Sequence, residues 1–173
     1  MLLRKAFQRH WPRLINLWPP FLGAGIRVTR ISPGWREVDV EMHLRRWNRN
    51  YVGTHYGGSL YSMTDPFFML MLIENLGRDY IVWDKAASIR FRRPGKGLVR
   101  ADFKLSDQQI QEIRQALETE EKIDRTFAVE VKDEAGTVIA EVQKQIHVKR
   151  KSAPASRPSD QTTGSVLTGA PHP

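Results

Sequence analysis

Residues 60–77, LYSMTDPFFMLMLIENLG, are apolar almost all the way round a helical projection, and Gly77 supplies a C-terminal cap. A helix without a polar face should be buried on every side. We therefore predict one buried helix around 58–76. Pro66 has no N–H to donate to the preceding turn, so we expect the helix to kink at Asp65.

Alternating apolar and polar residues on both sides of this helix predict strands. The strand candidates are 26–44 (a hairpin with a Pro33-Gly34 turn), 85–92, 98–105, 123–131 and 137–148. A capping box at Ser106 and Gln109 begins a short amphipathic helix. Because hairpins dominate, the sequence predicts an α+β fold in which a curved antiparallel sheet wraps around one long buried helix.

The composition limits the classes of function. With 173 residues, 20.0 kDa and 40% apolar residues, the chain has the size and apolar content of a single folded domain. The absence of cysteine excludes disulfides, thiolate metal sites and a cysteine nucleophile, and it fits a reducing compartment, so we expect a cytoplasmic protein. A net charge of +8 predicts an anionic partner: nucleic acid, a membrane surface, an acidic protein or a phosphorylated small molecule. Nucleic acid is disfavoured because no recognition motif accompanies the charge.

The two ends of the chain differ from the middle. Residues 1–20 combine arginines with an apolar stripe that Pro19-Pro20 ends, and we expect a helix packed on the domain; membrane-surface contact is the less favoured alternative. The domain proper should span 21–150. Residues 151–173 are rich in Pro, Ser and Thr without aromatic residues, which predicts a disordered tail.

Residues 50–65, NYVGTHYGGSLYSMTD, resemble the active-site segment of hotdog-fold acyl thioesterases of the phenylacetate-degradation type, which show Asn-x-x-Gly-x-x-His-Gly-Gly and a later acidic residue. Residues 89–97 resemble the Phe-x-x-Pro strand end of that family. The family histidine is replaced by Tyr56, and His55 stands one place earlier.

The resemblance implies a hotdog fold and hydrolysis of an acyl thioester of CoA or acyl carrier protein, within fatty acid metabolism. It also implies a homodimer or homotetramer. We expect no metal, since no His, Asp and Glu stand at ligand spacing, and no cofactor apart from the CoA of the substrate. The alternative is a non-catalytic acyl-CoA-binding or ligand-sensing module of the same fold.

The candidate catalytic residues are Asp65, Asn50, Gly58 and Tyr56. Asp65 is the candidate base or nucleophile, although Asp before Pro is also a common helix cap. Backbone N–H groups of Gly58 and its neighbour Gly57 could stabilise an oxyanion, or the pair could form only a tight turn. Asn50 could orient water or form an Asx-turn, and Tyr56 could hydrogen-bond near the carbonyl or simply pack.

The candidate substrate-binding residues are Gly57 and a basic cluster at one strand end and its turn. The cluster consists of Arg90, Arg92, Arg93 and Lys96. Its charges suit the phosphates of CoA or the acidic surface of a carrier protein. A solvated strand face is the alternative interpretation.

Overall fold

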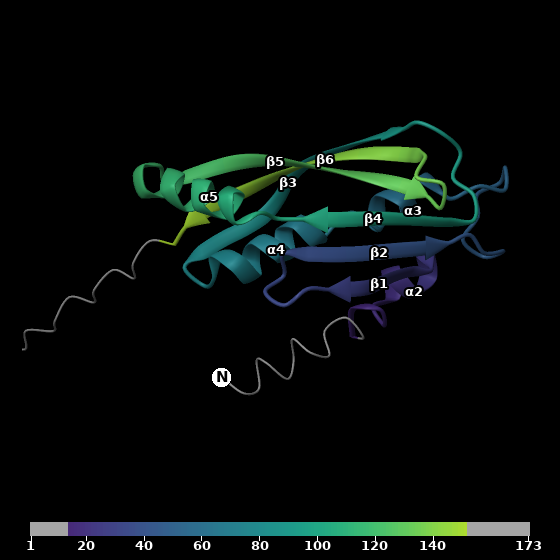
Figure 1. Cartoon of the computed structure of the whole chain (residues 1–173), viewed down its shortest axis with the longest axis horizontal. Coiled ribbons are helices and arrows are strands. Elements are labelled where there is room, and N and C mark those ends of the chain that lie inside the picture. The colour runs from purple at the N-terminus through teal and green to yellow at the C-terminus, as the bar shows by residue number, and fades with distance from the viewer. Residues whose placement is uncertain (1–13, 152–173) are drawn as a thin grey trace, which may run out of the picture.

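The computed structural model describes residues 14–151, so the predictions for 1–13 and for the tail beyond 151 lie outside the described residues. The elements are α2 (Pro19–Ala24), β1 (Ile26–Ile31), β2 (Glu37–His43), α3 (Gly57–Ser62), α4 (Phe67–Leu76), β3 (Tyr80–Phe91), β4 (Leu98–Lys104), α5 (Asp107–Thr119), β5 (Lys122–Asp133) and β6 (Val138–Arg150) (Figure 1). All strand pairs are antiparallel, in the order β1-β2-β4-β5-β6-β3. The predicted α+β architecture is confirmed.

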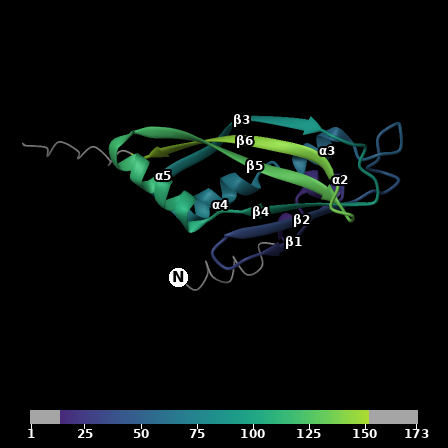
Figure 2. The ribbon, with the colours of Figure 1, turned by 45° about the horizontal axis from the view of Figure 1, so that its top comes forward.

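The sheet curls around α4, with β5 and β6 above this helix and β1 and β2 below it in Figure 2. Aromatic contacts hold the two layers together. Phe68 stacks on Phe127 of β5 with ring centroids 4.9 Å apart, and Phe67 lies 5.0 Å from Phe103 of β4. These rings are buried, so their removal from water is a main source of stability for the fold.

The predicted burial of α4 on every side is wrong for one face. Phe67, Phe68, Met71 and Leu72 are buried, whereas Met69, Leu70 and Ile73 remain partly or largely exposed. Within residues 14–151 the sheet reaches around only part of the helix, so the apolar composition overstated the burial of this helix.

The predicted kink is present as a complete interruption between α3 and α4. Residues 63–66 separate the two helices, and Pro66 is the N-cap of α4 without a side-chain cap bond. The missing N–H of proline accounts for the break. Asp65 therefore leaves the helix and does not cap it through its side chain, which contradicts the helix-cap alternative.

At the N-terminal side, the prediction that Pro19-Pro20 end a helix is wrong: both prolines begin α2, and a turn precedes them. Proline suits the first helical positions because those N–H groups have no partner within a helix. Ile15 and Phe21 are buried against the sheet, so this part of the chain packs on the domain from residue 14 onward.

The two outer strands of the sheet differ. The amide group of Asn16 binds both backbone groups of Val28 in β1: it accepts from the N–H at 2.7 Å and donates to the C=O at 2.9 Å. β3 is 12 residues long and begins at Tyr80, earlier than the predicted start at residue 85. Among the described strands it pairs only with β6. β3 thus offers an unpaired edge to another strand.

Candidate functional site

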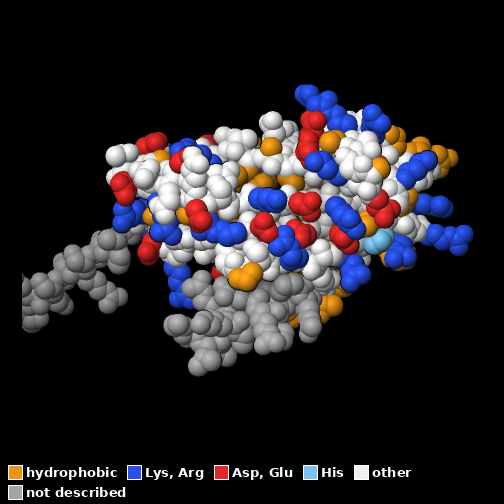
Figure 3. Space-filling model, viewed as in Figure 1, with side chains coloured by type: hydrophobic (Ala, Val, Ile, Leu, Met, Phe, Trp, Pro, Cys, Tyr) orange, Lys and Arg blue, Asp and Glu red, His pale blue; other side chains and the backbone are white. Residues whose placement is uncertain are grey.

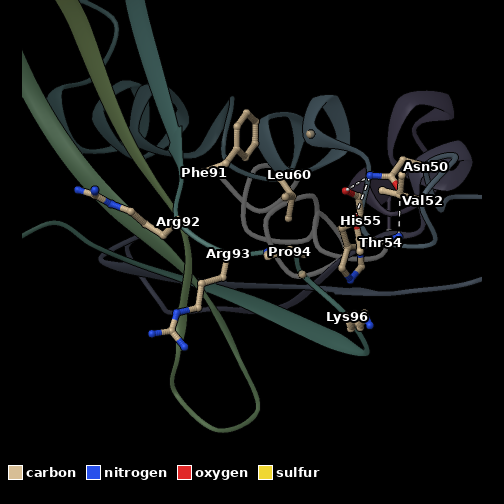
Figure 4. A pocket seen from close by; sticks show the side chains of 12 residues that line it. Asn50, Val52, Thr54, His55, Leu60, Phe91, Arg92, Arg93, Pro94 and Lys96 are labelled. Carbon is tan, nitrogen blue, oxygen red and sulfur yellow. Dashed lines mark hydrogen bonds between the residues drawn. The ribbon is translucent and has the colours of Figure 1, made fainter.

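A pocket of about 620 Å³ opens between the 50–57 segment and the turn that follows β3 (Figure 4). It is lined by Asn50, Val52, Thr54, His55, Gly57, Leu60, Phe91, Arg92, Arg93, Pro94, Gly95 and Lys96. The structure therefore brings both segments that carried the family resemblance to one cavity, although they lie far apart in the sequence.

Asn50 shapes the loop that forms one wall of this pocket. Its amide Nδ2 donates to Thr54 Oγ1 at 2.9 Å and to the His55 carbonyl at 3.3 Å, and its Oδ1 accepts from the Thr54 N–H at 2.9 Å. Both amide hydrogens thus bind within the loop. Asn50 lines the pocket, and its polar atoms brace the loop rather than point freely at a ligand.

His55 is a pocket residue that the sequence pattern did not single out. Its Nε2 lies 3.0 Å from the Gly97 carbonyl, which can only accept, so Nε2 carries the proton and Nδ1 is an acceptor. Nδ1 is buried and has no partner among residues 14–151. Burial lowers the pKa of His55 from 6.5, and the Gly97 hydrogen bond opposes that shift only in part. The only sequence signal was its place next to the family histidine position.

Tyr56 and Gly58 lie away from this pocket. Tyr56 is 59% exposed, and its ring packs over Gly58, where an added Cβ would come within 2.4 Å of the ring. The phenol borders a separate hollow with Trp47 and Arg49. Gly57, in contrast, lines the pocket beside Phe91, whose ring would lie 2.9 Å from a Cβ at position 57.

The basic cluster divides into paired and unpaired members. Arg92 forms a bidentate pair with Glu141, with N–O distances of 2.8 and 2.7 Å, and this pair raises the pKa of Arg92. Arg93 and Lys96 line the pocket without a side-chain partner in the described part of the chain. Arg90 does not line it. Figure 3 shows Lys and Arg side chains projecting from the end of the molecule where β3 connects to β4.

Asp65 does not line the pocket of its own chain. Its Oδ1 accepts a hydrogen bond from Lys144 Nζ at 2.7 Å. Lys144 also lies 3.1 Å from Asp84 Oδ2 and 3.4 Å from Tyr61 Oη. Its side chain is 0% exposed, whereas that of Asp65 is 46% exposed.

This charged group perturbs its own members. Burial alone would lower the pKa of Lys144, but the hydrogen bonds and charges of Asp65 and Asp84 outweigh it and raise that pKa. Burial also raises the pKa of Asp84, against the opposing charge of Lys144. Lys144 was not among the predicted site residues. The sequence signal for it was a lysine at an inward position of an alternating strand, between Val142 and Ile146.

Neither a metal cluster nor a membrane-spanning helix is present in residues 14–151. No group of three His, Asp or Glu side chains in this range stands close enough to hold a metal ion. Within the same range, every helix is too short or too polar to cross a membrane.

Solved structures show the same fold. PA5026 from Pseudomonas aeruginosa, a protein of unknown function described as a probable thioesterase, has a TM-score of 0.71 at 23% identity and covers 83% of this chain and 96% of its own. The thioesterase HI1161 from Haemophilus influenzae has a TM-score of 0.60 at 12% identity and covers 82% and 90%.

A mutant of the phenylacetic acid degradation protein PaaI from Thermus thermophilus has a TM-score of 0.52 at 23% identity and covers 75% of this chain and 97% of its own. At these identities, the structural similarity shows the hotdog fold and no more. No curated protein matches the chain. A family model described as a domain of unknown function, DUF4442, matches residues 7–148, and the chain therefore belongs to the DUF4442 family.

Proposed function

We propose that this protein is a cytoplasmic, homo-oligomeric thioesterase that hydrolyses acyl-CoA or acyl carrier protein. One observation carries the proposal: the pocket holds cationic and hydrogen-bonding groups but no carboxylate, while the partly exposed Asp65 stands outside it on a hotdog scaffold with an open edge strand. The two halves fit together when they come from different subunits, as in the hotdog enzymes that the chain resembles.

The pocket suits the non-reacting part of such a substrate. Arg93 and Lys96 offer charge to the phosphates of CoA or of a phosphopantetheine arm. Leu60 and Phe91 provide an apolar wall. These contacts would bind ground and transition states equally and so serve affinity.

The reaction needs an oxyanion donor and a base. The backbone N–H of Gly57, at the first position of α3, has no partner within its helix, and Gly57 lines the pocket. Asp65 of the neighbouring subunit takes a proton from water, and the water oxygen attacks the thioester carbonyl. The tetrahedral intermediate then expels the thiolate, which takes up that proton. The products are a carboxylic acid and a free thiol.

The open edge of β3 supports the assembly. Two copies of β3 that pair across a two-fold axis would join two sheets into one and satisfy the free backbone groups of both edges. A homodimer is the smallest assembly that this pairing produces.

Non-catalytic acyl-CoA binding is the second candidate function. One observation favours it: Lys144 occupies Oδ1 of Asp65, which leaves only Oδ2 for a water molecule. In that case the pocket would bind an acyl-CoA without cleaving it.

A panel of acyl-CoA and acyl carrier protein thioesters, followed by thiol release, tests the proposal. Asp65→Asn should remain folded and oligomeric while its kcat falls by at least ~10², the usual cost of losing a general base. A wild-type protein that binds acyl-CoA but releases no thiol would support the binding module. An Asp65→Asn variant with wild-type turnover would remove the proposed base.

A further inference from the structure

We propose that Lys144 is a positioning residue for the Asp65 carboxylate. The inference rests on the proposed function, since it assigns a task within the same site. Lys144 does not line the pocket, so it would act on the reaction through Asp65.

The location of Lys144 is unusual for a lysine. It occupies an inward position of β6, in line with the buried Val142 and Ile146, and its side chain is fully buried. An ammonium group in such a place loses its hydration and is tolerated only when charged partners replace the water. A lysine that served solubility would face the other side of the strand.

Three oxygen atoms surround the ammonium group. Lys144 Nζ donates to Asp65 Oδ1 at 2.7 Å and to Tyr61 Oη at 3.4 Å, and it forms an ion pair with Asp84 Oδ2 at 3.1 Å. The partners come from the break after α3, from β3 and from α3 itself. The ammonium is therefore fixed from three directions, and a fixed donor fixes the carboxylate that it binds.

Asp65 needs such support because it stands where the helix is interrupted. Its backbone N–H donates to the carbonyl of Ser62, and the following residue, Pro66, is the N-cap of α4. Its side chain caps neither helix. The hydrogen bond from Lys144 engages Oδ1, so Oδ2 is the oxygen that this contact leaves for water.

The charges suit this task as well. Two carboxylates around one ammonium leave a net negative charge, and Asp84 has the less exposed side chain of the two, 23% against 46%. The titratable groups that face Lys144 are Asp65, Asp84 and Tyr61. Without the ammonium, the ionised form of Asp65 would lose its charged partner and stand near a second carboxylate.

The test is the double variant Lys144→Met/Asp84→Asn, which removes one cation and one anion together and so avoids a buried unpaired charge. We expect kcat to fall about tenfold with KM unchanged, because a base that is held less precisely slows the chemical step without weakening binding.

Lys149→Met is the matched control: it makes the same lysine change on the same strand, at a partly exposed lysine paired with Glu121 at 2.6 Å. It should leave both kcat and KM as in the wild type. A folded double variant with wild-type kcat would overturn the inference.

If the double variant does not fold, Lys144→Arg keeps the charge and displaces the donor. Its kcat should fall while KM stays unchanged, and an unchanged kcat would overturn the inference. Failure of the proposed function is a separate result: then the wild type itself cleaves no thioester, or Asp65→Asn has no effect.

Discussion

The pocket and the charged cluster of Asp65, Lys144 and Asp84 (the Asp65 cluster) are built in opposite ways. The pocket is open, is bordered by the unpaired cations Arg93 and Lys96, and contains no carboxylate among the described residues. Around Asp65, a buried lysine is held between two carboxylates, and none of the three lines the pocket. One region therefore has the groups that bind an anionic substrate, and the other has the group that could attack it.

The two edges of the sheet explain how such halves could meet. Asn16 closes the β1 edge by taking both backbone groups of Val28. Within the described chain, no side chain binds the outer backbone groups of β3 in a comparable way. β3 carries Asp84 of the Asp65 cluster and Phe91 of the pocket. The edge that can join a second subunit is thus the strand that connects both regions.

The largest expected effect is the rescue of two inactive variants by mixing. Gly57→Val places atoms where a Cβ already comes within 2.9 Å of Phe91, and should block the pocket. Asp65→Asn removes the base. Each variant alone should lose at least ~10² in kcat. Co-expression should restore about one quarter of wild-type activity, because about half of the dimers are mixed and each of these has one intact site.

Thiol release by the purified mixture measures this rescue, and a mixture of two Asp65→Asn preparations is the control. If the mixed sample stays as inactive as its parents, binding and chemical groups belong to one subunit and the two-subunit site is wrong.

A smaller effect should separate the free cations from the paired one. Arg93→Gln/Lys96→Gln should raise KM for CoA esters about tenfold with little change in kcat, since charged hydrogen bonds to phosphate would be lost from ground and transition states alike. Arg92→Gln, which breaks a pair with Glu141, should change KM much less. Steady-state kinetics provide the measurement, and short thioesters without the nucleotide should not distinguish the variants. A collapse of kcat would contradict a role in affinity.

The smallest effect concerns His55 and the stability of the pocket wall. The folded state lowers the pKa of His55 below 6.5, so the unfolded chain binds the proton first as the pH falls. Stability should therefore decrease as the pH drops below about 6.5 towards the lowered value. His55→Gln should flatten that part of the curve. Each kcal/mol lost corresponds to about 2–4 °C in Tm, which thermal melts can resolve. Parallel curves for the two proteins would show that His55 does not contribute this dependence.

Local patterns predicted most of the fold. The alternation in the strand candidates, the Ser106–Gln109 capping box and the proline at position 66 each act within a few residues, and all three are present in the structure. The residues of the site were harder to predict from local patterns. His55 rather than Tyr56 lines the pocket. An isolated antiparallel β-bridge between Arg49 and His55 orients this part of the loop, and neighbouring residues of extended chain point in opposite directions.

The sequence by itself therefore determined the strands, the helix break at Pro66, α5 and their order along the chain, because hydrophobic period, proline and capping residues act over one or two turns of chain. Only the tertiary structure decided the partners of the charges. Arg92 meets Glu141, 49 residues away, and Asp65 meets Lys144, 79 residues away. The register of long strands sets such contacts, and a shift of one residue would turn Glu141 and Lys144 of β6 to the opposite face of the sheet.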